Sequence, residues 1–146
     1  MGKQSSINIG VNPPPPIEQT IAILLDAGWR WFEDQVCYQI GDVWDQEPAP
    51  LVMWPDIAHL LEEQTTAGAD VSISLQWEDE STLPIDFGFH NDARDDSQTI
   101  HVYIGGIISH TLCGNFTDYS WYLTRTVCPM INAGYNVWFV NCEESY

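Results

Sequence analysis

Residues 71–106 read VSISLQWEDESTLPIDFGFHNDARDDSQTIHVYIGG, and this stretch decides the fold. Apolar and polar residues alternate in three runs, at 71–77, 84–90 and 99–104. A period of two puts one set of side chains on a buried face and the other set in water. The segments between the runs are short and turn-like, so the sequence predicts a three-stranded antiparallel meander with a polar outer face. In this register Ile73→Asp should destabilise the fold by several kcal/mol, whereas Ser74→Asp should have almost no effect.

Helical periodicity precedes and follows the meander. Apolar residues recur at helical spacing in 16–27 and 55–67, and a glycine follows each segment. Between these two helices, residues 29–40 are aromatic and alternate, which indicates a strand or bent ribbon. A third helix is expected to start at Asp118 and to break or kink at Pro129, where the backbone N–H is missing. The final strand, 135–140, is apolar on both faces and is therefore predicted to lie centrally in the sheet.

These elements predict an α+β fold, with an antiparallel sheet of about four to five strands and two or three helices packed on one face. Residues 1–15 are interpreted as a flexible N-terminal segment that contains a polyproline run, and 16–146 as a single α+β domain. A weak alternation at Ile7, Ile9 and Val11 leaves open a short edge strand instead of disorder.

The charge balance excludes several partner classes. The 146 residues include 21 Asp and Glu but only 4 Lys and Arg, which gives a formal net charge of −17. Such a chain should repel nucleic acid and anionic lipid, so direct binding to either is not expected. No apolar run approaches the roughly 20 residues of a membrane span, and no signal peptide is recognised at the start.

The cysteines indicate a reducing compartment. Cys37, Cys113, Cys128 and Cys142 form no C-x-x-C pair, and they are read as reduced, buried thiols of a cytoplasmic protein. A disulfide such as Cys113–Cys128 stays open, because the count is even.

Metal and catalytic signals are weak, and no cofactor is predicted. His110 forms an H-x-x-C pair with Cys113, and Cys128 and Cys142 could complete a tetrahedral zinc site, but structural sites usually show two tight pairs. A second cluster on the polar sheet face would combine His90 and His101 with Asp86 or Asp92. Nucleotide-binding, hydrolase and metalloprotease motifs are absent from the sequence, so an enzyme is the less favoured class.

The acidic residues gather in groups, and two aromatic residues lie where an interface would use them. Trp44 is set inside an acidic loop, and Tyr103 should face outward beside His101. Aromatic anchors within a charged rim are typical of tight protein interfaces, although Trp44 could equally fold back onto the core. The candidate partner-binding residues are Asp42, Trp44, Asp45, Glu47, Glu78, Asp79, Glu80, Asp92, Asp95, Asp96, His101 and Tyr103.

The leading hypothesis is a small acidic binding protein that neutralises a basic partner, as an immunity-type inhibitor of a toxin, for example a nuclease, would do. Carboxylates would stand in for phosphates and pair with Lys and Arg of the partner. The alternatives are an adaptor or subunit domain that docks by a sheet edge or the polyproline run, and a small enzyme that uses His90, His101 or Cys113.

Overall fold

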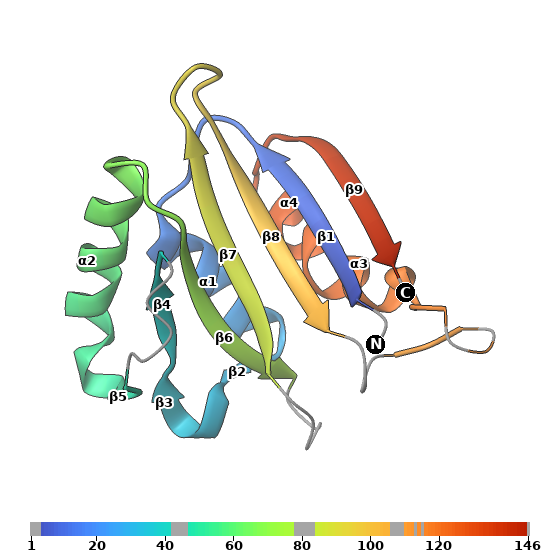
Figure 1. Ribbon diagram of the computed structural model, residues 1–146, viewed down its shortest axis with the longest axis horizontal. Helices are drawn as coiled ribbons and strands as arrows, with labels where there is room; N and C mark the ends of the chain where they lie inside the picture. The colour runs from blue at the N-terminus through green and yellow to red at the C-terminus, as the bar shows by residue number, and fades with distance from the viewer. Residues whose placement is uncertain are drawn as a thin grey trace.

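In the computed structural model, which describes residues 4–41, 47–77, 84–105, 110–112, 114 and 116–145, seven strands form one antiparallel sheet (Figure 1). The fold is α+β as predicted, but the sheet is larger than the expected four to five strands. The strands are β1 Gln4–Val11, β2 Trp29–Trp31, β3 Gln35–Val36, β4 Tyr38–Ile40, β5 Ala49–Pro50, β6 Val71–Trp77, β7 Ile85–Asp92, β8 Ser97–Gly105 and β9 Val137–Ser145. The α-helices are α1 Ile17–Ala27, α2 Trp54–Thr66, α3 Tyr119–Arg125 and α4 Val127–Asn132. Strands β3 and β5 pair with each other in a separate small sheet.

The predicted meander is confirmed as β6, β7 and β8, which are consecutive neighbours in the sheet. Ile73 pairs with Phe87, and Phe87 pairs with Val102, so one buried row crosses all three strands. All three side chains are fully buried. The alternation therefore assigned the faces of these strands correctly.

The N-terminal segment departs from the sequence expectation. Gln4–Val11 forms β1, which lies between β8 and β9 and pairs with both along its length. Ile7 and Ile9 are fully buried in the core. A strand with two neighbours is neither a flexible segment nor an edge strand, because hydrogen bonds and packing hold it from both sides.

The position of the last strand is also corrected. Strand β9 was expected in the centre of the sheet, but it forms an edge and pairs only with β1 among the described strands (Figure 1). Its apolar side chains remain partly in water: Trp138 is 53% exposed and Val140 is 41% exposed.

The opposite edge is built from two short strands placed end to end. Strand β2 pairs with Leu75–Trp77 of β6, and β4 pairs with Val71–Ile73. Between them a 3-10 turn, Phe32–Asp34, contains two residues with positive φ, Glu33 and Asp34. The predicted bent ribbon is therefore an interrupted edge strand.

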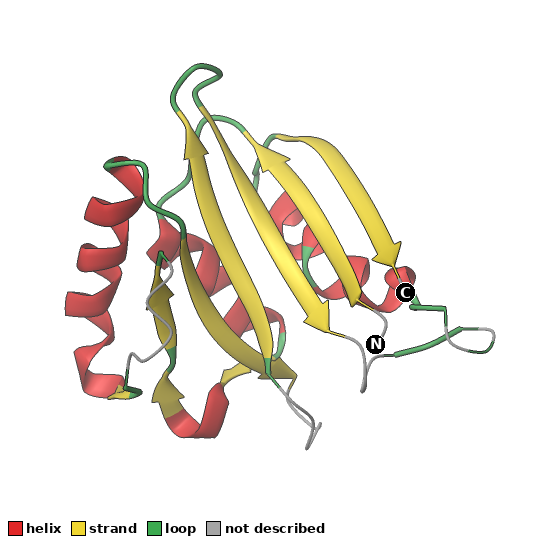
Figure 2. Cartoon of the chain, in the orientation of Figure 1, coloured by secondary structure: helices red, strands yellow, loops and turns green. Residues whose placement is uncertain are grey.

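The helices lie on one face of the sheet (Figure 2). Helix α1 buries Ile17, Ile21 and Leu24, and Gly28 ends it with a φ of 123° that an L side chain rarely adopts.

Asp118 caps α3 as predicted, its side chain accepting a hydrogen bond from the Trp121 backbone N–H. The break between α3 and α4 falls at Thr126, and not at Pro129, which lies in the first turn of α4. Proline is tolerated there because the first-turn N–H groups have no intrahelical partner.

An aromatic cluster joins α3 to the end of β6. The Trp29 ring makes edge contacts with Trp77, Phe87 and Trp121, at centroid distances of 5.3, 5.2 and 6.4 Å. Its indole N–H donates to the Arg125 carbonyl at 2.8 Å. The Arg125 guanidinium lies 4.2 Å from the centroid of the Trp121 ring. This cation–π contact adds to the packing of the aromatic cluster.

Candidate functional site

The sheet face opposite the helices carries a continuous polar row. Register places six residues side by side across six strands, so their side chains share this open face. They are Gln39, Ser72, Gly88, His101, Asn8 and Asn141, in order from the β4 edge to the β9 edge. Neighbouring apolar residues such as Ile7, Phe87 and Val102 face the other way and are buried in the core.

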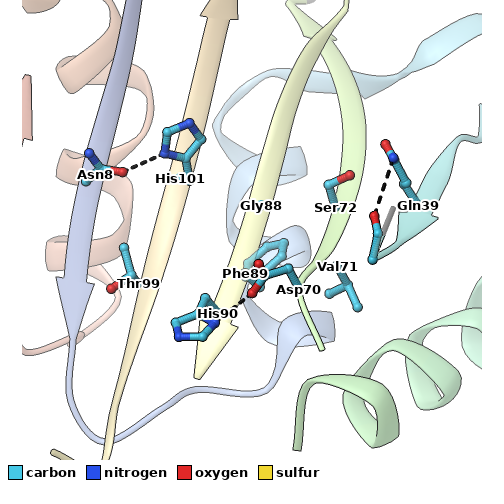
Figure 3. A pocket seen from close by; sticks show the side chains of 11 residues that line it. Asn8, Gln39, Asp70, Val71, Ser72, Gly88, Phe89, His90, Thr99 and His101 are labelled. Atoms are coloured by element: carbon cyan, nitrogen blue, oxygen red, sulfur yellow. Dashed lines mark hydrogen bonds and ion pairs between the residues drawn. The ribbon is translucent and has the colours of Figure 1, made fainter. Parts of the chain in front are cut away.

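A hollow of about 490 Å³ lies in the middle of this face. It is open to solvent and receives side chains from β1, β4, β6, β7 and β8 (Figure 3). Its lining residues are Asn8, Gln39, Gly41, Asp70, Val71, Ser72, Gly88, Phe89, His90, Thr99 and His101. The volume lies within the range of about 300–1,000 Å³ that is usual for ligand pockets.

Gly88 forms the floor of the hollow. A Cβ at this position would meet nothing closer than 3.6 Å, and the backbone there is not left-handed. Gly10, which also lies on the open face, differs: a Cβ there would lie 2.1 Å from the Phe139 ring, which already covers it. The space above Gly88 is therefore open, whereas the space above Gly10 is filled.

Both histidines of the hollow are oriented by a neighbouring side chain. His90 Nδ1 lies 2.6 Å from Asp70 Oδ1, and His101 Nδ1 lies 2.5 Å from Asn8 Oδ1 (Figure 3). Because the carboxylate and the amide oxygen only accept, each Nδ1 carries the proton in the neutral ring. Nε2 is then the hydrogen-bond acceptor of each imidazole.

Burial lowers the pKa of His101 below the ordinary value of 6.5, and the negative charge of Glu143 opposes this shift. The imidazolium is disfavoured in the folded state, so His101 stays neutral at pH 7. Its ring also stacks on Tyr103, with centroids 6.4 Å apart.

We expect the NMR titration of His101 to have its midpoint below pH 6.5, because desolvation penalises the charged ring. Glu143→Gln should lower this pKa further, since the carboxylate favours the imidazolium. The lowered pKa also means that the contribution of His101 to stability is complete above about pH 6.5 and decreases as the pH falls. Glu18→Gln, on α1, is the matched control and should not move the titration. A His101 midpoint above 6.5 would contradict this assignment.

Carboxylates lie on the polar face and at one end of it. Asp86 accepts a hydrogen bond from the Ser74 hydroxyl at 2.6 Å, and Glu143 lies on the same face of β9. At the β7–β8 turn Arg94 pairs with Asp92 at 3.3 Å, and this pairing lowers the pKa of Asp92. Asp95 and Asp96 in the same turn are exposed.

The structure brings only part of the predicted interface together. Asp42, Trp44, Asp45, Glu78, Asp79 and Glu80 lie outside the described residues. Glu47 is exposed before β5, Asp92 is the last residue of β7, and Asp95 and Asp96 lie in the β7–β8 turn. His101 lines the hollow, and Tyr103 lines a neighbouring hollow of about 610 Å³ together with His101 and Glu143.

The sequence suggests a cluster of His90 and His101 with Asp86 or Asp92, but the carboxylate that contacts His90 is Asp70. Extending the β6–β7 hairpin by one position would have found it, because Val71 pairs with Phe89 and position 70 then falls opposite position 90. Asn8 was not identified, since nothing local in the sequence shows that β1 lies beside β8.

The structure describes three of the four cysteines, and therefore only part of the candidate zinc site. Cys37, Cys128 and Cys142 are free; Cys128 and Cys142 are exposed, which corrects the expectation of buried side chains. Cys113 lies outside the described residues. His110 stacks on Trp121 with centroids 3.6 Å apart. Among the described residues, no group of three or more His, Cys, Asp or Glu is arranged to hold a metal ion.

Within the described ranges, no helix is both long and apolar enough to cross a membrane. No family model, no curated protein and no solved structure matches this chain.

Proposed function

We propose that this protein is an acidic binding protein that neutralises a basic protein partner, as an immunity-type inhibitor of a toxin does. The observation that carries the proposal is a polar sheet face that carries carboxylates and that no described helix covers, on a chain of net charge −17. The open face provides a surface to which a partner can bind, and the negative charge of the chain favours a basic partner.

The net negative charge is larger than solubility requires. A small domain stays soluble with a net charge of magnitude about 2–8. Even if every Lys and Arg of the chain paired with a separate carboxylate, 17 carboxylates would remain. Such an excess repels itself and lowers stability, and contact with a basic partner would relieve that repulsion.

The distribution of aromatic side chains supports a protein partner. Tyr103 is 38% exposed on the open face, and Trp138 is 53% exposed and contacts the Phe139 ring at 4.8 Å. Tyr103 lines the same hollow as Glu143, so this tyrosine can combine apolar contact with charge pairing by its neighbour. Tyrosine and tryptophan are enriched among binding hot spots.

One observation favours a second candidate, a small enzyme. The Asp70–His90 pair has the geometry of a general base held by a carboxylate. Its side chains are 74% and 55% exposed, however, so water reaches the pair freely and screens its charges. Binding is therefore the function that the geometry supports better.

The first experiment is affinity capture from the native host with the full chain as bait, eluted with a salt gradient. The expected partner is a basic protein whose activity is lost in the complex. Its association should slow as salt rises, because the screening length falls from about 30 Å at 0.01 M to about 10 Å at 0.1 M. Retention of acidic or neutral proteins only, with no dependence on salt, would contradict the proposal.

Charge reversal at two matched sites tests where the partner binds. Asp70, Asp95 and Glu143, all exposed on or beside the open face, are changed together to Lys. The control changes three exposed helix residues, Glu18, Asp26 and Glu63, to Lys and alters the net charge equally. The open-face variant should lower the association rate at least tenfold more than the control does, because steering depends on where the charges lie. Equal association rates for the two variants would show that only the net charge matters and would contradict binding at the open face.

A further inference from the structure

We propose that the hollow above Gly88 is a socket for an arginine side chain of the basic partner. This inference rests on the proposed function and adds the chemical group that the site recognises. It follows from the shape of the hollow, from its hydrogen-bonding groups and from its charge.

The shape comes from a missing side chain at the centre of a polar row. Gly88 lies between Ser72 and His101, its neighbours in register on β6 and β8. Figure 3 shows bare ribbon at Gly88 with side chains on both flanks. The hollow of about 490 Å³ has room for a whole arginine side chain, and its floor is the flat backbone of a β-strand.

The lining is rich in hydrogen-bond acceptors. Nδ1 of His90 faces Asp70 and Nδ1 of His101 faces Asn8, so in the neutral form of each ring Nε2 is the acceptor. The hydroxyls of Ser72 and Thr99 can accept as well. A ligand that satisfies several separate acceptors must itself carry several donors.

The charge of the site selects a cation. Asp70 lies at the rim, and Asp86 lies next to Gly88 along β7 on the same face. An anionic ligand would meet these carboxylates and the net charge of −17. A guanidinium fits better than an ammonium, because it spreads five N–H donors over a plane that can lie on a flat floor, whereas an ammonium is a compact point charge.

The first test uses three small probes on the full chain: the N-acetyl amides of arginine, lysine and citrulline. Citrulline has the shape of arginine without its charge. The arginine probe should cause saturable NMR shifts at Gly88, His90 and His101, with a dissociation constant of about 1 mM that is at least fivefold tighter than for lysine. Citrulline should cause none. Equal shifts with all three probes, or shifts located elsewhere, would overturn the socket.

The second test fills the hollow. Gly88→Val adds a β-branched side chain where a Cβ makes only ordinary contacts, so the fold should be kept. It should abolish the shifts caused by the arginine probe, and Gly88→Ala should weaken them. Gln76→Val is the matched control, because Gln76 lies on the same face of β6 outside the hollow and should leave the probe bound. Undiminished binding to Gly88→Val would contradict the proposal.

The third test uses the captured partner and distinguishes failure of the arginine socket from failure of the proposed function. Gly88→Val should weaken binding to the partner at least tenfold. One Arg→Ala change in the partner should cause the same loss, and the two changes together should cause no further loss. If the wild-type protein binds the partner in a salt-dependent manner and Gly88→Val binds equally well, the socket is wrong and the proposed function stands. If the wild-type protein binds no basic protein, the proposed function itself fails.

Discussion

Trp29→Ala is expected to lower the free energy of unfolding by about 3–5 kcal/mol, the usual cost of truncating a buried tryptophan. Trp29 is fully buried and contacts three aromatic rings, those of Trp77, Phe87 and Trp121. The change removes these contacts, leaves a cavity and removes the donor to the Arg125 carbonyl. Since domains are stable by about 5–15 kcal/mol in total, a loss of this size should be evident in a urea titration.

Trp138→Ala is the control for Trp29. Trp138 is 53% exposed on the edge strand β9, so its truncation should cost less than about 1 kcal/mol. Trp29→Phe should fall between the two, because it keeps a ring but loses the N–H donor. Equal effects of the two alanine variants would show that the cluster around Trp29 does not hold α3 against the sheet.

Ile73→Asp should destabilise the protein by about 3–5 kcal/mol, the range measured when a buried charge is left without a partner. Ile73 is fully buried, and its neighbours in register, Tyr38 and Phe87, offer no positive charge. The carboxylate must stay ionised in an apolar site or become protonated at a cost. Burial raises the pKa of this carboxyl, so the loss should become smaller as the pH falls below the raised pKa, which urea titrations at pH 7 and pH 5 would measure.

The structure revises the expectation for the adjacent position. The sequence alone predicted almost no effect for Ser74→Asp, because Ser74 faces away from the core. The Ser74 hydroxyl, however, donates to Asp86 at 2.6 Å, directly across the strand pair. An aspartate would replace this bond with a pair of like charges, so we expect a loss of about 1–2 kcal/mol. A larger loss for Ser74→Asp than for Ile73→Asp would overturn the assignment of the two faces.

Local periodicity was sufficient for the first two helices and the meander, but the break between α3 and α4 lies at Thr126 and not at the expected Pro129. The alternation from Val71 to Trp77 needs no distant partner, because a strand with one wet face shows the same pattern wherever it lies. The limits of α1 and α2 followed from their apolar spacing and from the residues at their ends. Composition likewise determined the net charge, and with it the class of partner that we propose.

The tertiary structure alone decided which strands are neighbours and therefore where the site lies. Periodicity states which side of a strand is buried, but not which strand pairs beside it. Nothing local in Gln4–Val11 reports that β8 and β9 flank it, and the apolar character of β9 suggested a central strand although it forms an edge. The hollow depends on this choice, because Asn8 orients His101 only when β1 lies next to β8.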